Sequence, residues 1–324
     1  MRLRRLAWIP ALTLASSAPL AACSSSTDAT GSPTVVATTT ILGSITQDIV
    51  ECADPDARTS VLMPIGADPH DFSPSSDQVA QLVTASVVVA NGLGLEAGLD
   101  DALENAASDG ATVIEVADLV DPIPFGEHAD DHAEDDHADE DSGDDHGHGD
   151  EDPHFWFDMN RMASAAETIG DELAVGNGDA YAECGQQVAD EIRSAEADVR
   201  ELLEGVPVDR RLLVTDHDAL GYLSDTYGYE IAGTVIPAGT TLAEPSSADL
   251  ADLVATMQSE GVRAIFTNTA DPTALSKAVA EEVGGDVQVV PLYVGSLGEP
   301  GSGAEDYISM MRTNAERISA ALTS

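Results

Sequence analysis

Short runs of β-branched residues alternate with segments of helical periodicity along most of the chain, and this alternation constrains the fold more than any other feature. In the first half, the expected strands are Thr34–Thr39, Thr59–Met63, Val87–Ala90 and Thr112–Val116, and the expected helices are Ile41–Glu51 and Ser76–Thr84. Such alternation predicts a mainly parallel sheet with helices on its faces.

The same alternation returns in the second half, after a stretch in which helices dominate. The expected strands are Leu212–Thr215, Glu230–Val235, Val262–Thr267 and Val287–Pro291, and the expected helices are Ala219–Tyr227, Ser247–Glu260, Pro272–Val283 and Glu305–Leu322. The stretch between the halves has an apolar stripe from Met162 to Leu173 and a long charged helical pattern over Asp179–Leu203. The predicted fold is therefore α/β, with two lobes that each contain a mainly parallel central sheet flanked by helices. A long rigid helix would join an N-terminal lobe over 34–158, through a helical linker over 159–206, to a C-terminal lobe over 207–324.

The N-terminal residues have the pattern of a targeting segment. A basic start is followed by the apolar stretch Leu6–Leu20, which is too short for a stable membrane span. It ends in Leu-Ala-Ala-Cys, which is typical of a bacterial lipoprotein signal, so we predict cleavage after residue 22 and a lipid on the Cys23 thiol. The alternative is an ordinary secretory signal with a chance cysteine. With a polar tether over 23–33, the expected location is extracytoplasmic, lipid-anchored to the bacterial cell membrane.

Acidic residues greatly outnumber basic ones, and this limits the possible partners. With 59 Asp and Glu against 13 Lys and Arg, the formal net charge is −46. Nucleic acid is excluded as a partner because phosphate binding requires a basic face. Cations suit such a field far better.

Two cysteines remain once Cys23 is assigned to lipid. Cys52 and Cys184 form an even pair, and an exported protein meets an oxidising environment, so one disulfide is expected. The alternative is two free buried thiols.

Histidine is concentrated in one acidic segment, the loop 126–152. It contains five of the eight histidines, namely His128, His132, His137, His146 and His148. Imidazoles and carboxylates together are ligands for a borderline divalent metal such as zinc. The segment has too few apolar residues to form a packed core, so we expect a loop that captures metal weakly. The alternative is a solvated acidic linker.

The other three histidines lie at separate loops or loop–helix junctions. His70 follows the second expected strand, His154 closes the acidic segment, and His217 follows the first expected strand of the second lobe. Ligands of open α/β sheets bind outside the carboxyl ends of the strands. Because three imidazoles are a common set of zinc ligands, we predict that these histidines form a metal site.

Three sequence motifs around these histidines resemble the metal-ligand motifs of a known family. They are Gly-Ala-Asp-Pro-His at 66–70, Asp-Pro-His-Phe-Trp at 152–156 and Thr-Asp-His-Asp-Ala-Leu-Gly-Tyr at 215–222, with further matches at 91–96, 243–246 and 265–266. They are similar to those of the zinc/manganese solute-binding lipoproteins of ABC importers, the ZnuA/TroA-like family. The resemblance implies two α/β lobes with one metal between them, bound by His70, His154 and His217. It also implies delivery of the ion to an ABC permease in the membrane and no catalysis, and we expect a monomer.

The resemblance also bears on which metal is carried. Manganese members tend to have Glu where this chain has His217, and a set of three imidazoles favours zinc, so we expect Zn²⁺ as cargo. A manganese-binding member is the alternative. Gly295 stands where the family often supplies an Asp as fourth ligand, which leaves water or a nearby acid such as Glu244.

An exported zinc hydrolase is a more distant alternative, because three histidines and a water also describe catalytic zinc. The sequence has no His-Glu-x-x-His helix and no evident general base beside the three histidines.

Overall fold

The computed structural model describes residues 34–125, 151–269, 274–285 and 287–324, all of which belong to one structural unit, Ser32–Ser324. The predicted signal peptide, the lipidation site Cys23, the tether and the five histidines of the 126–152 loop lie outside the described residues. Within the described part of the chain, no helix combines the length and apolar character needed to cross a membrane.

The first sheet has four parallel strands in the order β2-β1-β3-β4. Its strands are β1 (Val35–Ala37), β2 (Thr59–Val61), β3 (Val87–Ala90) and β4 (Thr112–Glu115). The helices that pack around it are α1 (Thr40–Ala53), α2 (Ser76–Thr84) and α3 (Asp100–Ser108), with short 3-10 helices η1 (Ala97–Leu99) and η2 (Ala117–Leu119). The sequence analysis missed α3, because its buried residues are only Ala102, Leu103 and Ala106 and give a weak helical stripe.

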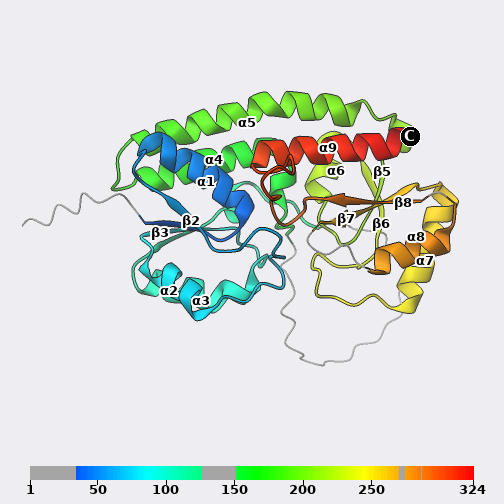
Figure 1. Cartoon of the computed structure of the whole chain (residues 1–324), viewed down its shortest axis with the longest axis horizontal. Helices are drawn as coiled ribbons and strands as arrows, with labels where there is room; N and C mark the ends of the chain where they lie inside the picture. Colours follow the sequence, from blue (N-terminus) through cyan, green and yellow to red (C-terminus); the bar gives the residue numbers. More distant parts are fainter. Residues whose placement is uncertain (1–33, 126–150, 270–273, 286) are drawn as a thin grey trace, which may run out of the picture. The chain divides into compact units, whose positions relative to one another are not determined.

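The second sheet repeats this topology, with four parallel strands in the order β6-β5-β7-β8 (Figure 1). Its strands are β5 (Leu212–Thr215), β6 (Glu230–Thr234), β7 (Ala264–Asn268) and β8 (Gln288–Leu292). Its helices are α6 (Gly221–Tyr227), α7 (Ser247–Glu260), α8 (Ala274–Val283) and α9 (Tyr307–Thr323), with η4 (Val208–Arg210) before β5. The predicted α/β class with two parallel-sheet lobes is therefore confirmed.

Strand β7 begins two residues later than predicted. Gly261 ends α7 in a left-handed conformation, and the Val262 N–H donates to the carbonyl of Met257. The backbone N–H of Val262 is therefore used to cap the C-terminus of α7 and is not available to the sheet. This is why the strand starts after Val262.

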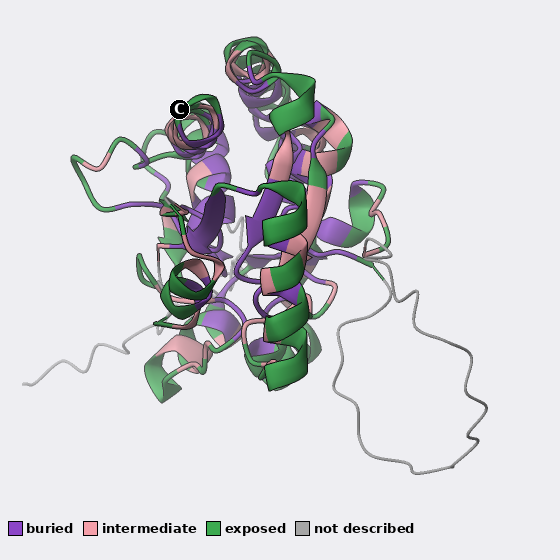
Figure 2. Cartoon of the chain, turned by 90° about the vertical axis from the view of Figure 1, so that its right-hand side faces the viewer, coloured by how far each residue is buried: buried purple, intermediate pink, exposed green. Residues whose placement is uncertain are grey.

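Both faces of each sheet are covered at its centre, which explains why the central strands β1, β3, β5 and β7 are mostly apolar and almost completely buried. In β1, Val35 and Ala37 pack into the largest hydrophobic cluster, whereas Val36 points to the opposite face, beneath α2 and α3. In β7, Phe266 joins the largest cluster and Ile265 faces α7 and α8. Figure 2 shows the buried strands between helices whose outer sides are exposed. The largest cluster contains residues of both lobes and forms their shared core.

Two helices between the sheets form much of this shared core. The helix α4 (Met159–Ala174) packs along α5 (Ala180–Glu204), and α5 also contacts α1 of the first lobe and α6 and α9 of the second (Figure 1). Gly170 and Gly185 allow α4 and α5 to approach closely, because a Cβ on Gly185 would lie 2.9 Å from the Gly170 Cα. A larger residue at either position would push the two helices apart.

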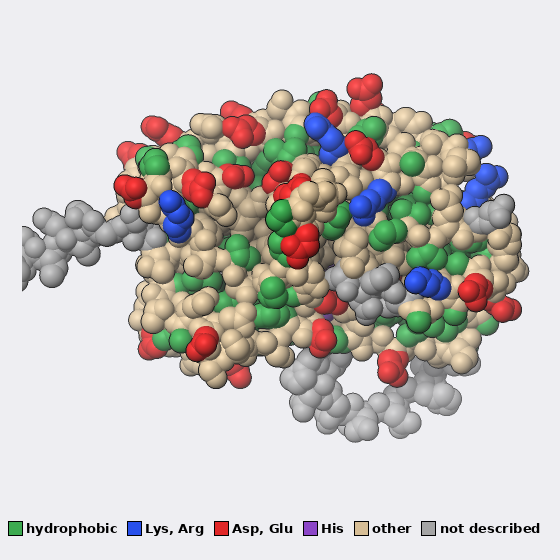
Figure 3. Space-filling view, in the orientation of Figure 1, with side chains coloured by type: hydrophobic (Ala, Val, Ile, Leu, Met, Phe, Trp, Pro, Cys, Tyr) green, Lys and Arg blue, Asp and Glu red, His purple; other side chains and the backbone are tan. Residues whose placement is uncertain are grey.

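Acidic side chains are spread over the face drawn in Figure 3, with few basic side chains among them. This face therefore carries the negative charge that the composition predicts. Such a surface attracts cations and repels polyanions.

A buried carboxylate occupies the interior of the first lobe beyond the strand ends. Glu96 is 2% exposed, and its Oε1 accepts hydrogen bonds from the Thr38 hydroxyl at 2.8 Å and the Asn91 N–H at 2.7 Å. Burial raises the pKa of Glu96 to about 7, although these hydrogen bonds act in the opposite direction. The folded protein therefore disfavours the ionised form of Glu96.

Cys52 of α1 and Cys184 of α5 form a disulfide, so the pairing expected from the sequence is present. It joins residues 132 positions apart and ties α1 to the helix that packs against both lobes. Because it closes a long loop, it restricts the unfolded chain strongly.

The disulfide gives a stability prediction. We expect the double variant Cys52→Ser, Cys184→Ser to unfold about 2–4 kcal/mol more easily than the oxidised parent, because the unfolded chain regains entropy. Urea denaturation with and without reductant measures this. The reduced parent is the matched control and should behave like the double variant, whereas equal midpoints for the oxidised parent and the variant would contradict the prediction.

Glu96 gives a prediction about pH. Its folded-state pKa of about 7 lies above its ordinary value of 4.5, so the folded protein favours the protonated side chain. The contribution of Glu96 to the free energy of unfolding is therefore present at low pH and is lost as the pH rises through about 7. Through Glu96, the metal-free parent should lose up to about 3 kcal/mol of its free energy of unfolding between about pH 5 and pH 7.5. We expect Glu96→Gln not to show this part of the loss. Denaturant unfolding at the two pH values measures this, with the exposed Glu104→Gln as control. An unchanged pH dependence in Glu96→Gln would refute this assignment.

Candidate metal centre

The structure brings His70, His154 and His217 together. Each pair of imidazole rings is separated by 5.4 Å between centroids, and one ring nitrogen from each histidine lies within 4.8 Å of the others. The Nε2 atoms of His70 and His154 are 3.3 Å apart. All three side chains are buried, with exposed fractions of 7%, 1% and 1% respectively. Three imidazoles in so small a space form a ready set of metal ligands.

The topology explains why three distant segments meet. His70 follows β2, and His217 comes two residues after β5, so each lies beyond the carboxyl end of a parallel strand. His154 immediately precedes the 3-10 helix η3 (Phe155–Phe157), which leads into α4. The strand ends of the two sheets therefore supply two histidines, and the start of the helical region supplies the third.

Each histidine is positioned by an aspartate one or two residues before it. The backbone N–H of His70 donates to Asp68 at 3.1 Å, that of His154 to Asp152 at 2.9 Å, and that of His217 to Asp216 at 2.9 Å. These local bonds fix the three turns. The sequence analysis selected the histidines but missed the role of the aspartates, although their repeated place before each histidine was a usable signal.

Two of these aspartates also orient the imidazole rings. Asp152 Oδ1 lies 2.7 Å from His154 Nδ1, and Asp216 Oδ1 lies 3.0 Å from His217 Nδ1. When Nδ1–H donates to the carboxylate, the neutral imidazole keeps its lone pair on Nε2, which can then bind a metal. The Nε2 of His217 is buried and has no hydrogen-bond partner among the described residues. This atom lacks the partner that a buried polar atom normally has, and a bound cation would supply one.

The charges around the site favour a cation. Burial acts to raise the pKa of Asp216, but the charge and hydrogen bond of His217 outweigh it, so the pKa lies below its usual value. Burial acts to lower the pKa of His217, and the neighbouring Asp216 more than reverses this. Burial raises the pKa of Asp152 to about 8. Asp216 therefore stabilises positive charge in this cavity, whether it is carried by a proton or by a metal ion.

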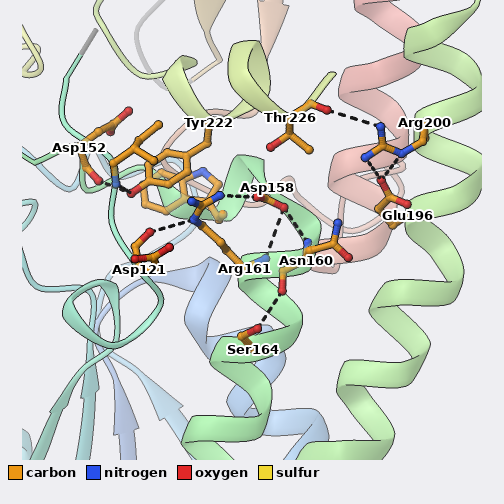
Figure 4. Close-up of polar contacts among 12 residues, drawn as sticks. Asp121, Asp152, Asp158, Asn160, Arg161, Ser164, Glu196, Arg200, Tyr222 and Thr226 are labelled. Carbon is orange, nitrogen blue, oxygen red and sulfur yellow. Dashed lines mark hydrogen bonds and ion pairs between the residues drawn. The ribbon is translucent and has the colours of Figure 1, made fainter. Parts of the chain in front are cut away.

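The loop that bears His154 is supported by the second lobe (Figure 4). The hydroxyl of Tyr222, from α6, donates to the carbonyl oxygen of Asp152 at 2.8 Å, and the Arg161 guanidinium lies 5.1 Å from the Tyr222 ring centroid. Arg161 in turn pairs with Asp158 at 2.6 Å, whose other carboxylate oxygen caps the start of α4. From the first lobe, the Asn91 side chain donates to the carbonyl of Pro153 at 3.0 Å. Both lobes therefore hold this loop.

The structure also bears on the fourth ligand. Gly295 lines the cavity, and a Cβ at this position would lie 2.7 Å from Cδ of Pro69. Pro69 therefore occupies the space that a side chain at position 295 would need. Glu244 is exposed, and the group of possible ligands among the described residues contains the three histidines without a carboxylate. Of the alternatives raised by the sequence, Glu244 is therefore not among the groups that the described residues bring to this site.

Comparison with known proteins places this site in a family. The model of the zinc-uptake complex component A, periplasmic (ZnuA), matches residues 35–321. The chain is 27% identical over 302 residues to the zinc-binding protein TroA of Treponema pallidum, which covers 91% of this chain and 90% of TroA. It is 25% identical over 292 residues to the manganese-binding lipoprotein MntA of Halalkalibacterium halodurans, with 89% and 88% covered.

The solved structures agree with the sequence comparison. The periplasmic zinc-binding protein TroA of Treponema pallidum superposes with a TM-score of 0.75 at 26% identity, over 90% of this chain and 99% of that chain. Because the family model matches nearly all of the described residues, the family is established over both lobes. The chain belongs to the ZnuA family, the metal-binding solute-binding proteins of ABC importers, which are not enzymes.

Proposed function

We propose that this protein captures Zn²⁺ with His70, His154 and His217 and delivers it to an ABC permease. The triangle of three buried imidazoles, with its carboxylate-oriented rings, is the observation that carries the proposal. The capture step is ligand exchange on a hydrated ion, and each imidazole must be neutral to take part. Asp152 and Asp216 hold two of the rings in the tautomer that leaves Nε2 available.

The choice of zinc rests on the donor set. TroA is named for zinc and MntA for manganese, so membership of the family alone leaves both metals open. Three imidazoles form a softer set than imidazoles mixed with carboxylates, which manganese prefers. His217 supplies the third imidazole here, whereas manganese members tend to have Glu at this position. Manganese transport is therefore the second candidate.

The proposal includes parts of the chain outside the described residues. Lipid on Cys23 would hold the protein at the outer side of the membrane, close to the permease. The five histidines of the 126–152 loop would gather zinc weakly, because nothing in their sequence fixes a coordination geometry and ordering the loop costs entropy. We propose that the protein works as a monomer.

The first prediction tests the three ligands. Replacing His217 with Ala should weaken zinc binding by more than about 100-fold, since even residues that only orient ligands are worth 10–100-fold. Titration with a competing zinc chelator measures the affinity, and circular dichroism checks the fold. His128→Ala is the matched control because it removes a loop histidine and should leave the tight site unchanged. Parent-like affinity in His217→Ala would remove His217 from the site.

The second prediction tests the metal. Zinc should bind at least about 100-fold more tightly than manganese, because imidazole donors and the intrinsic order of divalent affinities both favour it. Competition calorimetry with the two ions measures the ratio. His217→Glu should reduce the ratio of zinc affinity to manganese affinity, because it replaces an imidazole with a carboxylate. Manganese binding as tightly as zinc in the parent would replace the zinc proposal with the manganese one.

A further inference from the structure

A hydrogen bond from Thr241 joins the turn at residues 66–70, here called the His70 turn, to the second lobe. The hydroxyl of Thr241 donates to Oδ2 of Asp68 at 2.6 Å, while Oδ1 of the same carboxylate accepts the His70 N–H at 3.1 Å. Thr241 lies after β6, 173 positions further along the chain. Asp68 therefore connects the backbone of His70 directly to a loop of the other lobe.

The Thr241 loop is in turn attached to the His217 segment. The Ile236 N–H donates to the carbonyl of Asp216 at 2.8 Å, and the Asp218 N–H donates to the carbonyl of Ala238 at 2.9 Å. These two bonds fix the start of the loop on both sides of His217. The contact from Thr241 to Asp68 therefore links the segments that bear His70 and His217 through a short path of hydrogen bonds.

The beginning of the His70 turn makes a second contact with the same lobe. The Gly66 N–H donates to the Ser296 hydroxyl at 2.8 Å, and Pro69 packs against Gly295. Of these two hydrogen bonds, the one from Thr241 has a carboxylate oxygen as its acceptor, and the one from Gly66 has a hydroxyl oxygen. Hydrogen bonds to charged groups are worth more than those between neutral groups. The Thr241 contact is therefore the stronger of these two hydrogen bonds.

We propose that Thr241 is a positioning residue that slows release of the bound ion by holding the His70 turn against the second lobe. This inference rests on the proposed function, since it concerns the same metal site. His154 is held by both lobes, and His217 lies within the second lobe, whereas His70 reaches the ion from a turn of the first lobe. The His70 turn must move away from the second lobe before His70 can separate from His154 and His217. This movement breaks the hydrogen bond between Asp68 and Thr241.

Three variants test the proposal. Thr241→Val keeps the shape of the side chain and removes the donor, and zinc should dissociate about tenfold faster, the effect of losing one charge-assisted hydrogen bond. Thr241→Ser restores the hydroxyl and should return the parent rate. Thr240→Val is the matched control, because among the described residues the Thr240 hydroxyl accepts a bond within the loop, from the Leu242 N–H at 3.2 Å. The rate of zinc release from Thr240→Val should be within about twofold of the parent rate.

The rate of transfer of bound zinc to an excess of chelator, followed by stopped flow, is the readout. A parent-like rate in Thr241→Val, or equal acceleration in Thr240→Val, would overturn the positioning role and leave the proposed function intact. A parent that binds no zinc would overturn the proposed function itself. The metal-free unfolding midpoint should be the same in Thr241→Val and Thr241→Ser, and a lower midpoint in Thr241→Val alone would make the effect structural and overturn the proposal. Asp68→Asn, which weakens the acceptor, should also accelerate release.

Discussion

The pairing of a buried carboxylate with a buried imidazole is the interaction on which the site depends. Asp152 and Asp216 lie within hydrogen-bond distance of Nδ1 of His154 and His217, and when Nδ1–H donates to them, the opposite nitrogens keep a lone pair for a metal. Without the carboxylates these rings could rotate or adopt the other tautomer. The same aspartates also accept the backbone N–H of their histidines, so one side chain fixes both the turn and the ring.

The meeting of the three imidazoles requires two lobes that keep a defined distance. The largest hydrophobic cluster runs through both lobes, and α5 packs against helices of each. The disulfide attaches α5 to α1 at one end of this assembly. On the side of the metal site, the contacts between lobes include the hydrogen bonds from Thr241 to Asp68 and from Gly66 to Ser296, and the packing of Pro69 against Gly295.

The electrostatic character of the protein suits the capture of cations at two levels. The acidic surface raises the local concentration of cations, and the buried Asp216 stabilises positive charge inside the cavity. Specificity for one metal has to come from the donor atoms, because a negative field attracts every divalent ion alike. A third imidazole from His217, and Pro69 in the place of a side chain at position 295, make the donor set rich in nitrogen.

The sequence by itself determined the α/β class, most strands to within two residues, and the three histidines. Parallel strands buried on both faces, such as Val87–Ala90, give continuous apolar runs that are easy to recognise, and strand ends are the places where such folds bind ligands. The helix α3 was missed because a short stripe of mostly alanines gives little periodic signal. Only the tertiary structure decided which groups surround the histidines. The Asp68–Thr241 bond, the support of Asp152 by Tyr222 and the contact of Pro69 with Gly295 join residues far apart in the chain. No local pattern encodes such contacts, because they arise when the two lobes pack against one another.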